Sequence, residues 1–90
     1  MSVKINVRHF LPHLTNDQDV LEVSGSTIGE CFEQLVARFP KLRGWLFRED
    51  GSLSNFIDVY INLESAYPDE LTKPVKDGDE IHIVMKISGG

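Results

Sequence analysis

The residues with the clearest chemical potential in this sequence are the last two, Gly89 and Gly90. They follow an apolar, β-branched segment that ends at Ile87, with only Ser88 between them. Glycine has no side chain to clash with a channel wall, and it lets one backbone approach another closely. At ~3.3 Å per residue, the segment from Ile87 to Gly90 can extend roughly 13 Å beyond a sheet. We expect a flexible tail, residues 88–90, that can enter a narrow channel in another protein.

The single cysteine and the three histidines do not form a recognisable catalytic or metal-binding set. Cys31 lies on the apolar side of a predicted helix, which favours a buried structural thiol over a nucleophile. His9 and His13 are four residues apart, but they lie in a predicted strand and beyond Pro12, so a joint ligand role is not favoured. His82 alternates with apolar residues of the last predicted strand and should be solvated. We expect no catalytic residue, no bound cofactor and no metal.

Length and charge exclude several classes of function. A chain of 90 residues can enclose one core, and it should form one domain over residues 1–87. Nine basic against 14 acidic residues give a net charge of −5, which disfavours nucleic acid and anionic lipid as partners. The apolar runs are too short for a membrane span, and a lone cysteine suits a reducing compartment. We therefore expect a cytoplasmic protein.

The first half of the chain predicts a hairpin followed by a helix. Residues 3–10 alternate apolar and polar through Val7, turn-forming residues follow, and residues 20–23 resume as a second strand. Thr27 and Glu30 have the spacing of a capping box, in which each side chain accepts from the other's backbone N–H. The helix should begin at Ile28, carry its apolar stripe to about residue 39 and end at Pro40.

The second half predicts an irregular segment and two more strands. Residues 41–55 lose periodicity and should form a turn, a short helix and a loop; their aromatic cluster 45–47 favours the core over a docking surface. Residues 56–62 should form an interior strand, with core positions at Ile57, Val59 and Ile61. A tight turn at 76–79 then precedes the last strand, residues 80–87. The order of elements predicts an α+β fold with one helix laid across a mixed sheet of four to five strands.

This ordered set resembles the ubiquitin-like sulfur carriers of the ThiS and MoaD type, which share the β-grasp fold. The resemblance covers nearly the whole chain. Its features are the opening strand 3–7, the approach to the helix 23–30, the central strand 57–62, the turn and strand start 76–81, and terminal Gly89-Gly90.

The resemblance implies a role for the C-terminus. The Gly90 carboxylate, with an ordinary pKa near ~3.5, is an anion that resists attack by sulfide. An adenylating enzyme of the ThiF or MoeB type would use ATP to convert it into a mixed anhydride, and a sulfur donor would then form a thiocarboxylate. Gly89 and Ser88 would thread the partner's active site. The carrier would deliver sulfur to an acceptor synthase, MoaE-like or sulfhydrylase-like, and would be a cosubstrate rather than an enzyme.

The subtype and three alternatives stay open. ThiS proteins lack a segment like 43–55, and MoaD proteins commonly approach the glycines with more apolar residues than 85–88; the 51–53 loop, the strand 56–62 and the length look more like CysO carriers of cysteine or homocysteine synthesis. The alternatives are a small subunit of molybdopterin synthase, a ubiquitin-like modifier of lysines, and an interaction domain whose glycines are incidental. The sequence does not identify the sulfur donor or the pathway, whether thiamine, molybdopterin or amino-acid synthesis.

Overall fold

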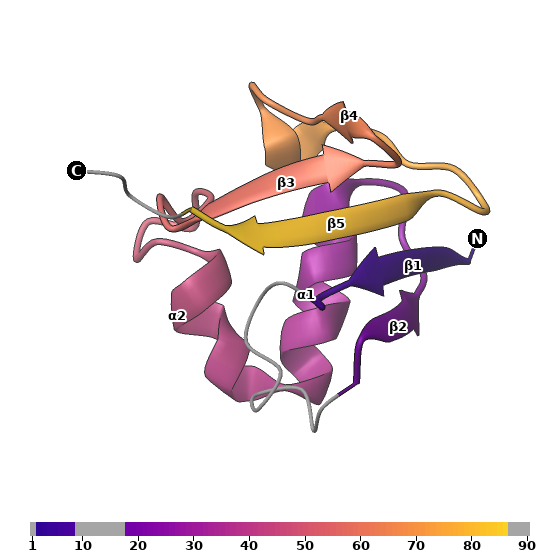
Figure 1. Cartoon of the computed structure of the whole chain (residues 1–90). Coiled ribbons are helices and arrows are strands. Elements are labelled where there is room, and N and C mark those ends of the chain that lie inside the picture. Colours follow the sequence, from indigo (N-terminus) through magenta and orange to yellow (C-terminus); the bar gives the residue numbers. More distant parts are fainter. Residues whose placement is uncertain (1, 9–17, 87–90) are drawn as a thin grey trace.

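The structure, a computed structural model, describes residues 2–8 and 18–86 and places their strands in one mixed sheet (Figure 1). The strand order across the sheet is β2-β1-β5-β3-β4. The strands are β1 (Val3–Asn6), β2 (Val20–Val23), β3 (Ile57–Ile61), β4 (Glu64–Ser65) and β5 (Glu80–Met85). The helical elements are α1 (Ile28–Arg38), η2 (Pro40–Leu42), α2 (Arg43–Leu46) and η3 (Glu70–Thr72).

The last strand in sequence is the centre of the sheet. β5 pairs in parallel with β1, where Ile5 lies opposite Ile81, and antiparallel with β3, where Val59 lies opposite Ile83. β1 and β2 form an antiparallel hairpin on one side, and the short β4 pairs with the end of β3 on the other. The two chain halves therefore meet along one strand, and every other strand depends on it for its position.

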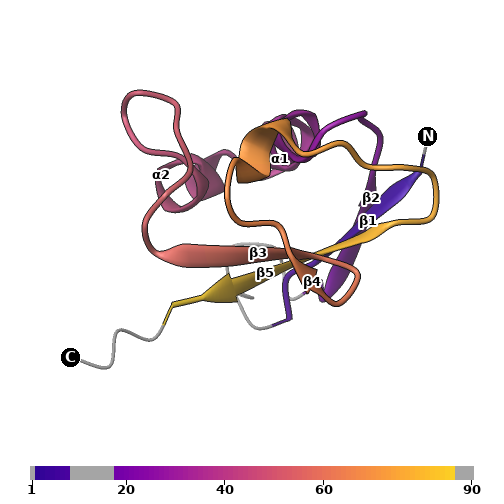
Figure 2. The ribbon, with the colours of Figure 1, turned by 90° about the horizontal axis from the view of Figure 1, so that it is seen from above.

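The strands bury alternate residues because the helical layer covers one face of the sheet (Figure 2). Ile5, Val59, Ile81 and Ile83 are buried on that face, and Ile61 and Met85 are half-buried against it. The buried residues of α1 that meet them are Ile28, Cys31, Phe32, Leu35 and Val36. This stripe is the one predicted from sequence, and Phe39 packs against it partly buried.

The boundaries of α1 follow from local chemistry. The Thr27 hydroxyl accepts a hydrogen bond from the Glu30 N–H at 3.2 Å, which makes Thr27 the N-cap as predicted. The Glu30 carboxylate does not return the bond to Thr27: it accepts from the N–H and the hydroxyl of Ser26, at 2.8 and 2.9 Å. The predicted reciprocal box is thus wrong in its second half. Pro40 ends the helix and begins η2.

The predicted α+β architecture is confirmed, with five strands. The predicted irregular segment contains η2 and α2, and residues 63–75 contain β4 and η3. Gly78, at φ +89°, makes the predicted tight turn before β5. In the part of the chain that the structure describes, no helix has both the length and the apolar character needed to cross a membrane. The predicted strand ends at residues 10 and 87 lie outside the described residues.

Candidate functional site at the end of the central strand

The chain is tied to the sheet up to the last residue that the structure describes. Met85 lies opposite Ile57 in the β3–β5 ladder, and the Lys86 N–H donates to the Phe56 carbonyl at 2.8 Å. The three predicted site residues, Ser88, Gly89 and Gly90, lie outside the described residues. The described part of the site is therefore the surface on which the C-terminal segment is rooted.

A charged pair lies on the open face of the sheet at this root. Lys86 Nζ is 3.7 Å from Asp58 Oδ1, and both side chains are about half exposed. An ion pair this accessible contributes little to stability, because water screens the two charges. It does neutralise the one lysine that immediately precedes the C-terminal segment.

An aromatic pair lies at the same root. The rings of Trp45 and Phe56 are 6.2 Å apart at their centroids and inclined at 60°. Trp45 is 37% exposed and Phe56 is 59% exposed. Their neighbours in sequence behave differently: Leu46 and Phe47 are buried, and the Phe47 ring meets Phe32 edge to face at 6.3 Å. The prediction that cluster 45–47 belongs to the core is confirmed for two of its three residues and wrong for Trp45.

Cys31 is a structural thiol, as predicted. It is fully buried and unpaired, and a Cβ placed on Gly25 would lie only 3.1 Å from its Sγ, so the backbone covers it closely. Burial raises the pKa of the Cys31 thiol, and the negative charge of Glu30 adds to the rise. The thiolate required of a nucleophile is therefore disfavoured at neutral pH.

His82 lies among polar side chains on the open face of the sheet. His82 is half-buried on the face of the sheet opposite the core, where it lies beside Tyr60 and Asn6. Its Nε2 is 3.5 Å from a Glu80 carboxylate oxygen, and the Asn6 amide donates to that same oxygen at 3.1 Å. Among the described residues no group of three potential ligands could hold a metal ion. His9 and His13 lie outside the described residues.

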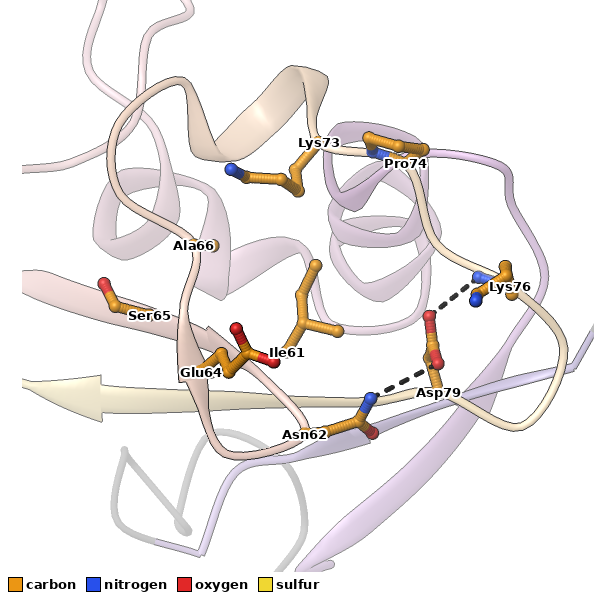
Figure 3. A pocket seen from close by; sticks show the side chains of 9 residues that line it. All are labelled: Ile61, Asn62, Glu64, Ser65, Ala66, Lys73, Pro74, Lys76 and Asp79. Atoms are coloured by element: carbon orange, nitrogen blue, oxygen red, sulfur yellow. Dashed lines mark hydrogen bonds between the residues drawn. The ribbon is translucent and has the colours of Figure 1, made fainter.

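A hollow of about 300 Å³ lies at the opposite end of β5 (Figure 3). Lys73, Lys76, Glu64 and Asp79 contribute two positive and two negative charges to its wall. Asp79 is engaged in the turn, since its carboxylate accepts from the Lys76 N–H at 2.8 Å and from the Asn62 amide at 3.4 Å. Ser65 also lines the hollow, and its hydroxyl oxygen accepts from the Tyr67 N–H at 3.2 Å. Among the hydrogen bonds of the described residues, none links this hydroxyl to a base, so the arrangement does not favour catalysis.

Sequence reasoning missed two residues of this site, Phe56 and Asp58. Phe56 was expected only as the first residue of a strand, and no pattern distinguishes an exposed aromatic from a buried one at a strand end. Asp58 did carry a signal: it alternates with Ile57 and Val59, so its side chain had to point away from the core.

Comparison with known proteins decides the family. The model of the ThiS family matches residues 6–90, nearly the full chain. This chain belongs to the ThiS family. The matched range includes the Gly-Gly pair.

Relatives of this ThiS-family protein are small carriers or modifiers. It is 34% identical to small archaeal modifier protein 1 of Haloferax volcanii over 83 residues, covering 80% of this chain and 92% of that protein. It is 30% identical over 95 residues to an Archaeoglobus fulgidus protein named "Putative sulfur carrier protein", with both chains fully covered. The ThiS-family match and these relatives confirm the predicted membership of the ubiquitin-like sulfur carriers and modifiers.

A solved structure confirms the predicted β-grasp fold of this ThiS-family protein. The similar chain is in the BexX/CysO complex of Amycolatopsis orientalis, with a TM-score of 0.86 and 29% identity, covering 98% of this chain and 99% of that one. The likeness therefore includes all the elements that root the C-terminal segment.

Proposed function

We propose that this protein is a sulfur carrier whose Gly90 α-carboxylate is converted to a thiocarboxylate. The observation that carries the proposal is the family match through the Gly-Gly pair, on a chain whose described residues offer no other reactive set. The protein is then a cosubstrate: an enzyme acts on its C-terminus, and its own side chains perform no catalysis.

The chemistry has two steps. A carboxylate oxygen of Gly90 attacks the α-phosphorus of ATP in a ThiF- or MoeB-type partner, which forms an acyl adenylate and releases pyrophosphate. Sulfide, HS−, from the donor then attacks the carbonyl carbon, the C–O bond to AMP breaks with AMP as the leaving group, and a thiocarboxylate remains. Activation is needed because the free carboxylate is an anion at neutral pH and repels a nucleophile. The terminal sulfur is itself a nucleophile, and an acceptor enzyme, MoaE-like or sulfhydrylase-like, consumes it.

The fold suits this task because the reactive end is rooted on the central strand of the sheet. β5 has a neighbour on each side, and the bond from Lys86 to Phe56 extends its attachment by one residue. The point at which the last four residues begin is therefore fixed relative to the surface that a partner binds. Ser88 and Gly89 present little bulk to the walls of the partner's active site.

Two further proposals concern setting and partners. The buried, unpaired Cys31 suits a reducing cytoplasm, where ATP is also available. The CysO chain seen together with BexX supports the expectation that a chain of this shape works in complexes with other proteins.

A second candidate is protein modification, favoured by the relative named small archaeal modifier protein 1. The same acyl adenylate would then be attacked by a lysine amine of a target protein, with AMP leaving and an isopeptide bond forming. The two functions share their first step and differ in the nucleophile. After trypsin digestion, which cleaves behind Lys86, detection of an Ile-Ser-Gly-Gly remnant on target lysines by mass spectrometry would identify the second.

The decisive experiment is intact-mass analysis after incubation with ATP, the adenylating enzyme and a sulfide source. Replacement of one carboxylate oxygen by sulfur should raise the mass by ~16 Da. Deletion of Gly90, or a bulky residue added after it, should abolish the shift. Cys31→Ser should keep the shift, because the buried thiol takes no part. A Gly90 deletion that still gains sulfur, or a folded Cys31→Ser variant that does not, would overturn the carrier function in favour of chemistry at the cysteine.

A further inference from the structure

The aromatic pair Trp45–Phe56 is exposed although the protein has a well-filled core. The two rings come from different elements, α2 and the turn before β3, and they contact each other at 6.2 Å between centroids. Burial of a large aromatic side chain lowers the free energy of the system. A partner that covers this exposed pair would therefore gain affinity from it. Aromatic side chains are also enriched in the buried centres of protein interfaces.

The position of the pair is set by the end of β5. The Phe56 carbonyl accepts the hydrogen bond from Lys86, so the backbone that carries one ring also holds the last described residue of the chain. Figures 1 and 2 show α2, the start of β3 and the end of β5 at the same end of the molecule. The pair is therefore beside the root of the C-terminal segment.

The short length of the C-terminal segment, residues 87–90, requires an enzyme that binds its end to lie close to the surface at the end of β5. Four residues separate Lys86 from the end of Gly90, and fully extended they span no more than ~14 Å. An enzyme that holds the Gly90 carboxylate against ATP must approach the root of the segment within that distance. The surface there includes the aromatic pair Trp45–Phe56 and, on the open face of the sheet, the ion pair of Lys86 with Asp58.

The basic groups near the aromatic pair are already paired with acidic groups of the same chain. The apolar surface of the two rings is therefore the feature that a partner can recognise. Lys86 faces Asp58 at 3.7 Å, and Arg43, whose guanidinium lies 5.5 Å from the Phe47 ring centroid, forms an ion pair with Glu33 at 2.8 Å. Each of these basic groups has an acidic partner within the protein. A partner therefore gains more from covering the two rings than from supplying a complementary charge.

We propose that the Trp45–Phe56 pair is a docking point for the adenylating enzyme, which covers the two rings with an apolar side chain. The proposal rests on the proposed function. The adenylating enzyme is the occupant because an unreactive carboxylate must be held in line with the α-phosphorus of ATP, and that requires a firm grip on the base of a four-residue segment. A thiocarboxylate brings its own nucleophile to the acceptor and depends less on such positioning.

The test is ATP–pyrophosphate exchange by the adenylating enzyme, with the carrier as the varied substrate. Phe56→Ala and Trp45→Ala should each raise the KM for the carrier about tenfold, the loss typical of an interface centre, while kcat changes little. Phe56→Tyr should retain the low KM. Leu63→Ala is the matched control, because Leu63 is 91% exposed just beyond the other end of β3. Thermal unfolding of each variant checks that the fold is intact.

The outcomes separate the two proposals. Wild-type protein that supports no exchange would contradict the proposed function itself. If wild-type protein is activated but folded Phe56→Ala and Trp45→Ala variants keep its KM, or if Leu63→Ala raises the KM equally, the docking point is wrong. Variants that are adenylated normally but fail only in sulfur transfer would also overturn it, because the rings would then serve the acceptor.

Discussion

The first turn of α1 is held by two side chains that act on neighbouring backbone groups. The Thr27 hydroxyl accepts from the Glu30 N–H, while the Glu30 carboxylate accepts from the N–H and hydroxyl of Ser26. The backbone on either side of Thr27 is engaged with another segment: the Ile28 N–H donates to the Lys73 carbonyl at 3.0 Å. The capping-box spacing takes no account of contacts with distant segments. It therefore predicted the Thr27 cap correctly but assigned the bond to the Glu30 carboxylate to Thr27 instead of Ser26.

Thr27→Ala should lower the free energy of unfolding by about 1 kcal/mol, because the Glu30 N–H loses its acceptor at the helix start. The measurement is the urea midpoint at constant slope. Thr27→Ser keeps an acceptor oxygen in the same place and should recover most of the loss. An unchanged midpoint in the alanine variant would contradict the cap.

The Glu30 carboxyl should contribute a measurable acid dependence. The two hydrogen bonds from Ser26, with the backbone bond the stronger influence, hold the pKa of Glu30 below its ordinary value. Its contribution to stability is therefore fully present above the ordinary glutamate pKa and is lost as pH falls through the lowered value. Ser26→Ala removes the hydroxyl donor and should move the pKa part of the way back, as measured by NMR titration of the carboxyl carbon. A pKa unchanged by Ser26→Ala would contradict the role of the hydroxyl.

At the scale of elements, α1 and η3 approach so closely that a glycine is required between them. A Cβ on Gly29 would lie 2.9 Å from the Leu71 carbonyl oxygen, and a backbone atom cannot move aside as the end of a flexible side chain can. Gly44 in α2 is the opposite case, because no atom lies within 4 Å of the position its Cβ would take. The two helices therefore provide a matched pair of substitutions.

Gly29→Ala should destabilise the protein by about 1–3 kcal/mol, because overpacking outweighs the better helix propensity of alanine. Gly44→Ala should stabilise it by up to about 1 kcal/mol, since only the propensity gain remains. Denaturant unfolding of both variants provides the measurement. A stabilised Gly29→Ala variant would mean that η3 can retreat from α1 without loss.

The elements could be predicted to the extent that their patterns are local. Period-two alternation located β1 and β5, the density of β-branched and aromatic residues located β3, and the apolar stripe with Thr27 and Pro40 located α1. The exposure of Trp45 could not be predicted, because α2 is a single turn and the three consecutive residues 45–47 face different surroundings. The aromatic half of the candidate site therefore appears only once α2 and the turn before β3 are brought together.

At the scale of the whole molecule, the order of strands depends on contacts between distant parts of the sequence. Alternation predicts that β1 and β5 are strands, but their parallel pairing joins residues 4–6 to 80–82 and leaves no local signal. The β-grasp topology was available only through the family resemblance. The Gly-Gly pair was only suggestive by itself, and it gained weight from its position beyond the last predicted strand and from the ordered set of elements that precedes it.

The stability of the sheet should fall from its centre to its edge. Native-state hydrogen exchange should find the Ile81 and Ile83 amides of β5 exchanging only through global unfolding, because strands flank them on both sides. The two residues of β4, Glu64 and Ser65, are exposed and should open at lower free energy. Equal protection of β4 and β5 would mean that the sheet opens as a single unit.

The central position of β5 also determines when the sheet can form during synthesis of the chain. Until Glu80–Met85 leave the ribosome, the β1–β2 hairpin and the β3–β4 pair have no strand to join them, and their apolar faces are uncovered. A product truncated before β5 should therefore remain unfolded and open to proteases. Formation of the native sheet thus requires that translation has passed β5. Partners that recognise the folded domain would then bind only chains that extend at least to the root of the C-terminal segment.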